Sequence, residues 1–250
     1  HSDSRRQRQM CIRDRVDTSL VTKSQNNNAR TSLAIAEIRE EPKVVIYRNN
    51  AADLLIDKQN IDSLNLENYA GIVITGTALS DEPSRSTINL LIEKSKNAKC
   101  PVIFDVDYRA NAWTSISLAS AELRGVAKIA DMCVGNREEF EIMFEQTDLR
   151  KVSANFNPNQ LVLFKKGADG CDIILDGETE SYTVFKLKEK KPYGAGDAFL
   201  GTILHSLSNG LSLESAIKRG NASAAIVVSK EGCASAMPNL NQLIEFIETH

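Results

Sequence analysis

Histidine and cysteine are both scarce in this chain, and neither is arranged as a catalytic or metal-binding group. Two of the three histidines, His1 and His250, are terminal, and only His205 is internal. A Ser-His-Asp triad or a multi-histidine metal site therefore has almost no residues to build on. The five cysteines lie far apart and include no C-x-x-C pair, which argues against a disulfide framework and a structural zinc site. We expect reduced, mostly buried thiols.

Long apolar runs and two common phosphate-binding motifs are also missing. No apolar run approaches the roughly 18 residues of a membrane span, and no signal-peptide pattern opens the chain. The P-loop pattern G-x-x-x-x-G-K-[ST] and the dinucleotide pattern G-x-G-x-x-G do not occur. We therefore expect a cytoplasmic protein without a membrane partner, and neither a P-loop enzyme nor a dinucleotide-binding fold.

The first 15 residues, HSDSRRQRQMCIRDR, differ from the rest of the chain in charge and pattern. They carry five arginines against two aspartates, which leaves 25 basic and 31 acidic side chains in the remainder. Because this remainder is acidic, we expect no nucleic-acid partner. Residues 1–15 are either a basic arm or a non-native or disordered tail. We favour the tail and assign residues 16–250 to one domain.

Short apolar runs of strand length alternate with segments of helical periodicity. The predicted strands are KVVIYR (43–48), AGIVITG (70–76), PVIFDVD (101–107), MCVGN (132–136) and LVLFKKG (161–167). The predicted helices span 84–97, 118–129, 138–144, 213–230 and 240–248. This alternation predicts an α/β fold whose parallel sheet is covered on both faces. Residues 29–48 contain two extended runs joined by a charged turn, which predicts a hairpin standing off that sheet.

Polar residues and glycines follow three of the predicted strands, where ligands of open parallel sheets collect. The residues are Asp105, Asp107 and Arg109; Asn136 and Glu139; and Lys165, Gly167 and Gly170. Each group also has a structural explanation, since aspartates cap helices, Asn-x-x-Glu forms capping boxes, and Gly-x-x-Gly occurs in turns. Taken singly, each group is better explained by structure than by function.

The stretch GAGD at 194–197 stands directly before an apolar segment of helical periodicity. Gly194, Ala195 and Gly196 let the backbone approach a ligand closely. The first amides of the following helix have no internal partner and attract an anion. Beside a transferring phosphoryl group, Asp197 can take the proton of an attacking hydroxyl. The stretch therefore predicts phosphoryl transfer to an alcohol.

Four motifs in this order resemble those of the ribokinase family of sugar kinases. They are Asp-x-Asp-x-Arg (105–109), Asn-x-x-Glu (136–139), Lys-x-Gly-x-x-Gly (165–170) and Gly-Ala-Gly-Asp (194–197). The stretches DVDYRANAW, KPYGAGDAF and SAAIVVSKEGCASAMP are similar to the branch of 5-dehydro-2-deoxygluconokinases of myo-inositol degradation, with 2-keto-3-deoxygluconate kinases as neighbours. The resemblance covers residues 16–250. It implies a three-layer α/β/α sandwich with a mostly parallel central sheet and a small β lid at about 29–48.

The activity that the resemblance implies is ATP-dependent phosphorylation of a primary hydroxyl on a keto-deoxy sugar acid. The expected substrate is 5-dehydro-2-deoxy-D-gluconate, which becomes its 6-phosphate, and the expected cofactors are ATP and Mg²⁺. One alternative is a 2-keto-3-deoxygluconate kinase or a fructokinase-like sugar kinase. Another is a catalytically incomplete nucleotide-binding fragment, which would not need Asp197.

The resemblance also assigns roles to the motif residues. Asp197 is the base, and the anion hole for the γ-phosphate consists of Gly194, Ala195 and Gly196. The nucleotide-binding residues are Lys165, Gly167, Gly170 and Asn221. The substrate-binding residues are Arg48, Asp107 and Arg109, and hydrated Mg²⁺ is assigned to Asn136 and Glu139. A guanidinium that grips a carboxylate through two hydrogen bonds would favour an acid sugar.

Two departures from the family pattern carry further expectations. An acid that helps to bind a monovalent cation usually precedes the glycine motif, and Lys191 stands in its place. Lys191 either replaces the charge of the cation, which predicts weak activation by potassium, or points into solvent. Family members also carry a first strand and a glycine-rich sugar-binding segment ahead of VDTSLV (16–21). We therefore expect a fold incomplete at its N-terminus and low activity of this chain. Separately, the predicted lid hairpin at about 29–48 leads us to expect a homodimer formed through the lid.

Overall fold

The computed structural model describes residues 17–37, 43–187, 190 and 193–250, which form parts of two compact units. The first unit contains the residues up to Cys133 together with Glu139–Asn155, and the second contains Val134–Glu138 together with Phe156–His250. Lys191, the tail at residues 1–15 and the turn of the predicted hairpin lie outside the described residues. The expectations for Lys191 and the tail stay predictions.

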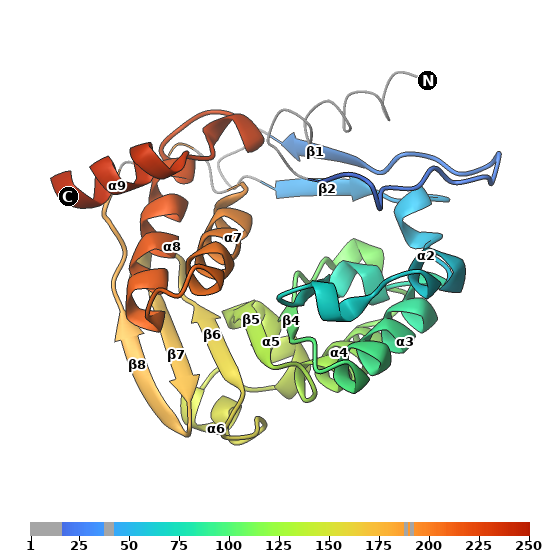
Figure 1. Ribbon diagram of the computed structural model, residues 1–250, viewed down its shortest axis with the longest axis horizontal. Coiled ribbons are helices and arrows are strands. Elements are labelled where there is room, and N and C mark those ends of the chain that lie inside the picture. Colours follow the sequence, from blue (N-terminus) through green and yellow to red (C-terminus); the bar gives the residue numbers. More distant parts are fainter. Residues whose placement is uncertain (1–16, 38–42, 188–189, 191–192) are drawn as a thin grey trace. The chain divides into compact units, whose positions relative to one another are not determined.

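The first unit contains two pairs of strands of different type (Figure 1). Strands β1 (Leu33–Glu37) and β2 (Lys43–Tyr47) pair antiparallel as a separate two-stranded sheet. Strands β3 (Ile72–Thr75) and β4 (Val102–Asp105) pair in parallel. The helices of this unit are α2 (Lys58–Asp62), α3 (Ser84–Asn97), α4 (Ile116–Ala127) and α6 (Leu149–Ser153).

The second unit holds an antiparallel strand trio and the C-terminal helices. Strand β7 (Cys171–Leu175) pairs antiparallel with β6 (Leu161–Lys165) on one side and with β8 (Glu178–Tyr182) on the other. Helices α7 (Ala195–Ser208) and α8 (Leu213–Val228) pack along each other, and α9 (Leu240–Thr249) follows against α8. Strand β5 (Met132–Asn136) and helix α5 (Arg137–Phe144) each contain a boundary between the units.

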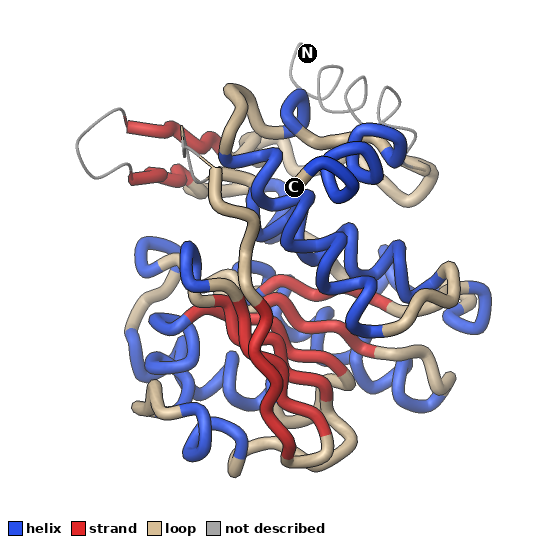
Figure 2. The backbone as a smooth tube through the Cα atoms, turned by 90° about the vertical axis from the view of Figure 1, so that its left-hand side faces the viewer, coloured by secondary structure: helices blue, strands red, loops and turns tan. Residues whose placement is uncertain are grey.

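The main sheet has the strand order β3-β4-β5-β6-β7-β8. Figure 2 draws the strands in red. All four residues of β4 are buried, as expected for an inner strand covered on both faces. The predicted α/β class with a mostly parallel central sheet is confirmed, and β7 runs antiparallel to its two neighbours, β6 and β8.

Local sequence signals account for most helix boundaries. Ser115 accepts a hydrogen bond from the Leu118 amide at the start of α4, and Asn239 with Gln242 forms a capping box at the start of α9. Helix α3 buries Ile88 and Ile92 one turn apart, and each such side chain contributes about 1.5–3 kcal/mol of hydrophobic free energy. The observed bounds lie within two residues of every helix predicted above.

Candidate active site

The glycine-rich turn before α7 lies in the second unit and has the backbone of an anion cradle. Gly194 is the N-cap residue of α7 and has a φ of 84°, a left-handed conformation that glycine adopts without steric cost. Having no side chain, Gly194 makes no capping hydrogen bond to the first turn. The first amides of a helix lack intrahelical acceptors, so this turn presents N–H donors. Asp197 lies exposed in the same turn.

The turn rests on the segment that follows α8. A Cβ atom at Gly194 would lie 3.4 Å from Cε of Met237 and 3.7 Å from Cβ of Cys233. Met237 packs against a buried cluster formed by Ala198, Val227 and Ala236. Packing against this segment therefore helps to hold the cradle backbone in place.

Lys165 brings a positive charge to the same cradle. It is the last residue of β6, and its Nζ lies 3.6 Å from the position of a Cβ atom at Gly196. An ammonium group beside a helix N-terminus strengthens the attraction of that terminus for an anion. The structure thus brings together a residue of the predicted nucleotide group and a residue of the predicted anion hole.

The other predicted nucleotide-binding residues have evident structural contacts. Gly170 has a φ of 93°, and a Cβ atom there would lie only 2.0 Å from the carbonyl oxygen of Tyr182, so this close approach requires glycine. Gly167 begins the short turn that leads to it. Asn221 is buried in α8, and its Nδ2 donates to the Thr183 carbonyl at 3.1 Å. Contact of these residues with a nucleotide stays a prediction.

Cys171, at the start of β7 in the second unit, has a raised pKa. Burial, the largest cause, raises the pKa of its thiol to about 11, although a hydrogen bond with Asn221 acts in the opposite direction. Cys100, Cys133 and Cys171 are buried, whereas Cys233 is exposed. Mostly buried cysteines are as expected, and their reduced state stays a prediction.

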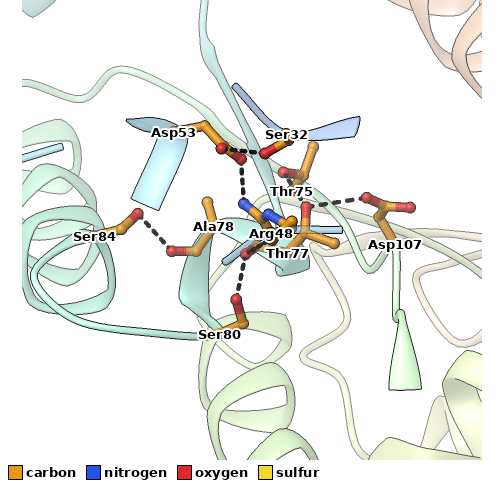
Figure 3. Close-up of polar contacts among 9 residues, drawn as sticks. All are labelled: Ser32, Arg48, Asp53, Thr75, Thr77, Ala78, Ser80, Ser84 and Asp107. Atoms are coloured by element: carbon orange, nitrogen blue, oxygen red, sulfur yellow. Dashed lines mark hydrogen bonds and ion pairs between the residues drawn. The ribbon is translucent and has the colours of Figure 1, made fainter. Parts of the chain in front are cut away.

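Arg48 in the first unit is held by protein groups on two sides (Figure 3). Its Nη1 donates to the Thr77 carbonyl at 2.9 Å, and its Nη2 forms an ion pair with Asp53. Ser32 donates to the other carboxylate oxygen of Asp53. Because the Arg48 side chain is only 12% exposed, these contacts fix the direction of its guanidinium. A grip on a substrate carboxylate by Arg48 stays a prediction.

Asp53 is ionised at neutral pH because the effect of its neighbours on its pKa is larger than the effect of its burial. Burial, the largest single cause, raises the pKa of the Asp53 carboxyl. Hydrogen bonds from Ser32 and Arg48 and the charge of Arg48 together lower this pKa by more than burial raises it. The net pKa lies below its ordinary value. Asp53 therefore neutralises Arg48 over the physiological pH range.

Asp107 lies two residues after the end of β4 and has a φ of 34°, which residues other than glycine rarely adopt. Thr77 donates from Oγ1 to Oδ2 of Asp107 at 3.1 Å, and Nη2 of Arg109 lies 2.6 Å from Oδ1. A Cβ atom at Gly76 would lie 2.1 Å from the carbonyl oxygen of Val106, so glycine there lets the two segments approach closely. Backbone strain of this kind concentrates at functional sites.

The two predicted magnesium residues belong to different units. Glu139 belongs to the first unit, is 4% exposed and accepts a hydrogen bond from the Tyr108 amide at 3.2 Å. Asn136 ends β5 and belongs to the second unit. Within the described residues, no group of three or more His, Cys, Asp or Glu side chains is arranged to hold a metal ion directly. The assignment of hydrated Mg²⁺ to Asn136 and Glu139 therefore stays a prediction.

Three polar residues of the first unit were not singled out in the sequence, namely Ser32, Asp53 and Thr77. Thr77 directly follows the predicted strand 70–76, so the rule that ligands collect beyond strand ends would have found it. Ser32 and Asp53 carry no such signal, because only the folded chain brings them to Arg48.

An anion cradle with a carboxylate in its first turn, set on an α/β fold, indicates an enzyme that transfers phosphoryl groups to an alcohol. The sequence pattern of the pfkB family of carbohydrate kinases matches residues 2–240. The chain belongs to this family and is a carbohydrate kinase.

Relatives agree with this family, and a solved structure shares the fold. The 5-dehydro-2-deoxygluconokinase of Photobacterium profundum is 36% identical over 236 residues, which is 90% of this chain and 70% of that protein. The protein of that name from Lacticaseibacillus casei is 35% identical over 240 residues, covering 93% of this chain and 73% of the relative. A fructokinase structure from Vibrio cholerae, with bound fructose, ADP and potassium ion, has a TM-score of 0.87 at 24% identity, over 97% of this chain and 80% of that one. Among the described residues, no helix combines the length and apolar character needed to cross a membrane.

Proposed function

We propose that this kinase transfers the γ-phosphoryl group of ATP to the primary hydroxyl of 5-dehydro-2-deoxy-D-gluconate, giving the 6-phosphate and ADP. The substrate assignment is supported by the two relatives of that name at 36% and 35% identity. A fructokinase structure from Xylella fastidiosa with bound ATP, at a TM-score of 0.85 and 18% identity over 96% of this chain and 80% of that one, shares the fold and supports ATP as the phosphate donor.

The observation that carries the proposal is the turn Gly194–Asp197 at the start of α7. Amides of this turn and the Lys165 ammonium attract the γ-phosphate, and Asp197 accepts the proton of the substrate hydroxyl. The hydroxyl oxygen then forms a bond to the γ-phosphorus while the bond to the bridging oxygen of ADP breaks. Positioning and charge neutralisation provide most of the rate enhancement in such transfers.

The cofactor ions follow from the same proposal. Bound Mg²⁺ neutralises phosphate charge, and Asn136 and Glu139 would each hold water molecules of the hydrated ion. A buried carboxylate such as Glu139 suits this purpose. We also infer weak activation by potassium, because Lys191 stands where an acid is usual. Rates in potassium chloride and in tetramethylammonium chloride test this, and several-fold activation by potassium would contradict it.

The test of the proposed function is ADP production with a panel of sugars. The panel contains 5-dehydro-2-deoxygluconate, 2-keto-3-deoxygluconate, fructose, ribose and adenosine, and the variant Asp197→Asn accompanies the wild-type chain. A protein extended by a family-like N-terminal segment is measured in parallel, because we expect low activity of the chain alone. Preference for the first sugar supports the proposal. Preference for fructose favours the fructokinase alternative, and ATP binding without turnover in either protein favours a nucleotide-binding module.

We further infer a homodimer formed through the hairpin β1–β2. The strand register places Leu33 opposite Tyr47 and Ile35 opposite Val45, so these four apolar side chains share one face. Leu33, Ile35 and Tyr47 are 56%, 44% and 57% exposed. Light scattering should show a dimer that Leu33→Lys dissociates. Ile129→Lys, which changes an exposed aliphatic residue outside the hairpin, should leave the dimer intact, and a monomeric wild-type chain would contradict the inference.

A further inference from the structure

Thr77 contacts two of the predicted substrate-binding residues at once, although it is itself in no recognised motif. Its backbone carbonyl accepts hydrogen bonds from Nη1 of Arg48 and from Oγ of Ser80, both at 2.9 Å. Its hydroxyl donates to Oδ2 of Asp107 at 3.1 Å and lies 3.2 Å from the hydroxyl of Thr75 (Figure 3). A hydroxyl has a single proton to donate, so Thr75 is the donor in the second contact.

The turn that contains Thr77 is held firmly by the first residues of α3. Ser84 donates to the Ala78 carbonyl at 2.7 Å, and Arg85 donates from Nε to the Leu79 carbonyl at 2.8 Å. Nη2 of Arg85 donates to the Ser80 carbonyl at 2.9 Å. The backbone of Thr77 is thus fixed independently of its own hydroxyl, and removal of that hydroxyl leaves the turn in place.

Both arginines predicted to bind the substrate, Arg48 and Arg109, already have a carboxylate partner within the chain. Arg48 pairs with Asp53, and Arg109 pairs with Asp107. The Arg48 pair involves a guanidinium that is 12% exposed, whereas Arg109 is 49% exposed. A carboxylate arriving from solvent therefore reaches Arg109 more easily, and there it competes with Asp107.

We propose that Thr77 is a positioning residue that sets the preference of this kinase for an anionic sugar. Thr77 and Arg109 contact different oxygens of Asp107, Oδ2 and Oδ1 respectively. When the Thr77 hydroxyl is lost, Oδ2 can also turn to Arg109, because a planar guanidinium matches both oxygens of a carboxylate. Asp107 then occupies the donors of Arg109 that a substrate carboxylate needs.

This inference rests on the proposed function, because it assumes an acid substrate. It predicts a selective effect: removal of the hydroxyl weakens binding of an acid sugar and leaves binding of a neutral sugar unchanged. A purely structural role of Thr77 predicts equal loss for both kinds of sugar. The ratio of the two dissociation constants therefore separates positioning from folding.

The experiment measures dissociation constants for 2-keto-3-deoxygluconate and fructose by isothermal titration calorimetry, which does not require turnover. The proteins are the wild-type chain, Thr77→Val, Thr77→Ser and Thr179→Val, the last being the same change at an exposed position of β8. For Thr77→Val we expect acid binding to weaken by about 10- to 100-fold, the range for a lost hydrogen bond to a charged group. The affinity of Thr77→Val for fructose should stay within about twofold of the wild-type value. The affinities of Thr77→Ser and Thr179→Val for both sugars should also stay within about twofold of the wild-type values.

A double-mutant cycle tests whether Thr77 acts through Asp107. In an Asp107→Asn background no carboxylate competes for Arg109, so Thr77→Val should change acid binding by less than about twofold. An undiminished effect in that background overturns the proposal. Equal weakening of acid and fructose binding by Thr77→Val also overturns it, as does a Thr77→Ser variant that behaves like Thr77→Val.

Two further outcomes, failure of the proposed function and destabilisation of the Thr77→Val variant, can be distinguished from the outcomes above. If the wild-type chain binds fructose as tightly as the acid, the proposed function fails, and the role of Thr77 in acid selectivity fails with it. If Thr77→Val has a lowered thermal unfolding midpoint, Thr77→Ala replaces it in the comparison with Thr77→Ser. Acid selectivity that is lost in Thr77→Ala but kept in Thr77→Ser supports the proposal, and unchanged selectivity in Thr77→Ala overturns it.

Discussion

Replacing Gly196 with alanine should stabilise this protein and impair its reaction at the same time. Gly196 lies within α7 and has no positive φ, and a Cβ atom there would meet Nζ of Lys165 at 3.6 Å, an ordinary van der Waals distance. Alanine therefore fits without a clash and gains about 0.5–1 kcal/mol over glycine in a helix. For a chain of this size that gain raises the thermal midpoint by about 1–4 °C.

The same methyl group lies between the cradle amides and the Lys165 ammonium, where the γ-phosphate is expected. We expect kcat/KM for ATP to fall by about 10²-fold or more, the size of effect seen when one oxyanion-hole contact is lost. Gly201→Ala is the matched control, because Gly201 lies in the same helix and a Cβ atom there has no neighbour within 4 Å. That control should gain similar stability with unchanged kinetics.

Differential scanning calorimetry and ADP-coupled kinetics on both variants provide the measurement, with calorimetric titration of ATP where turnover is low. A Gly196→Ala variant that keeps the wild-type affinity and rate for ATP would refute the assignment of this turn as the phosphate cradle. A destabilised Gly196→Ala variant would refute the packing argument instead, since the structure leaves room for the methyl group.

Three other outcomes follow from the same structure. Asp197→Asn should lower kcat by about 10²–10⁴-fold while the dissociation constant for ATP stays unchanged, and a matching loss of ATP affinity would argue against a base. Asp53→Asn should be less stable than wild type at neutral pH, with the difference disappearing as acid protonates the carboxyl, because the lowered pKa of Asp53 means that its contribution is lost as pH falls. Alkylation at pH 8, followed by mass spectrometry, should modify exposed Cys233 before Cys171 and leave Cys171 unmodified until unfolding, because Cys171 is buried and its pKa is about 11. Rapid labelling of Cys171 in the folded protein would contradict this.

Strands β7 and β8 were not among the predicted strands, although the sequence contains a signal for them. Asp176 and Gly177 have φ values of 54° and 78°, as in the two-residue hairpin turn that an Asp-Gly pair favours. The flanking segments 171–175 and 178–182 pair antiparallel around that turn. The pair is a local feature, and the Asp-Gly signal was sufficient to predict it.

The amino-acid sequence by itself determined most helices, most strands and the glycine-rich turn at 194–197. These depend on neighbouring residues: hydrophobic periodicity, capping side chains and a glycine that adopts positive φ. The order of the four motifs was also sufficient to indicate the family that residues 2–240 match.

Only the tertiary structure decided which distant residues meet. It placed the Lys165 ammonium beside Gly196, buried Asn221 against the Thr183 carbonyl, and tied Arg48 and Asp107 to the single residue Thr77. These contacts join segments far apart in the chain, and each depends on strand order and on close approaches such as that at Gly76. Hydrophobic periodicity specifies which face of an element is buried but not which element covers it, so such contacts cannot be predicted from one sequence.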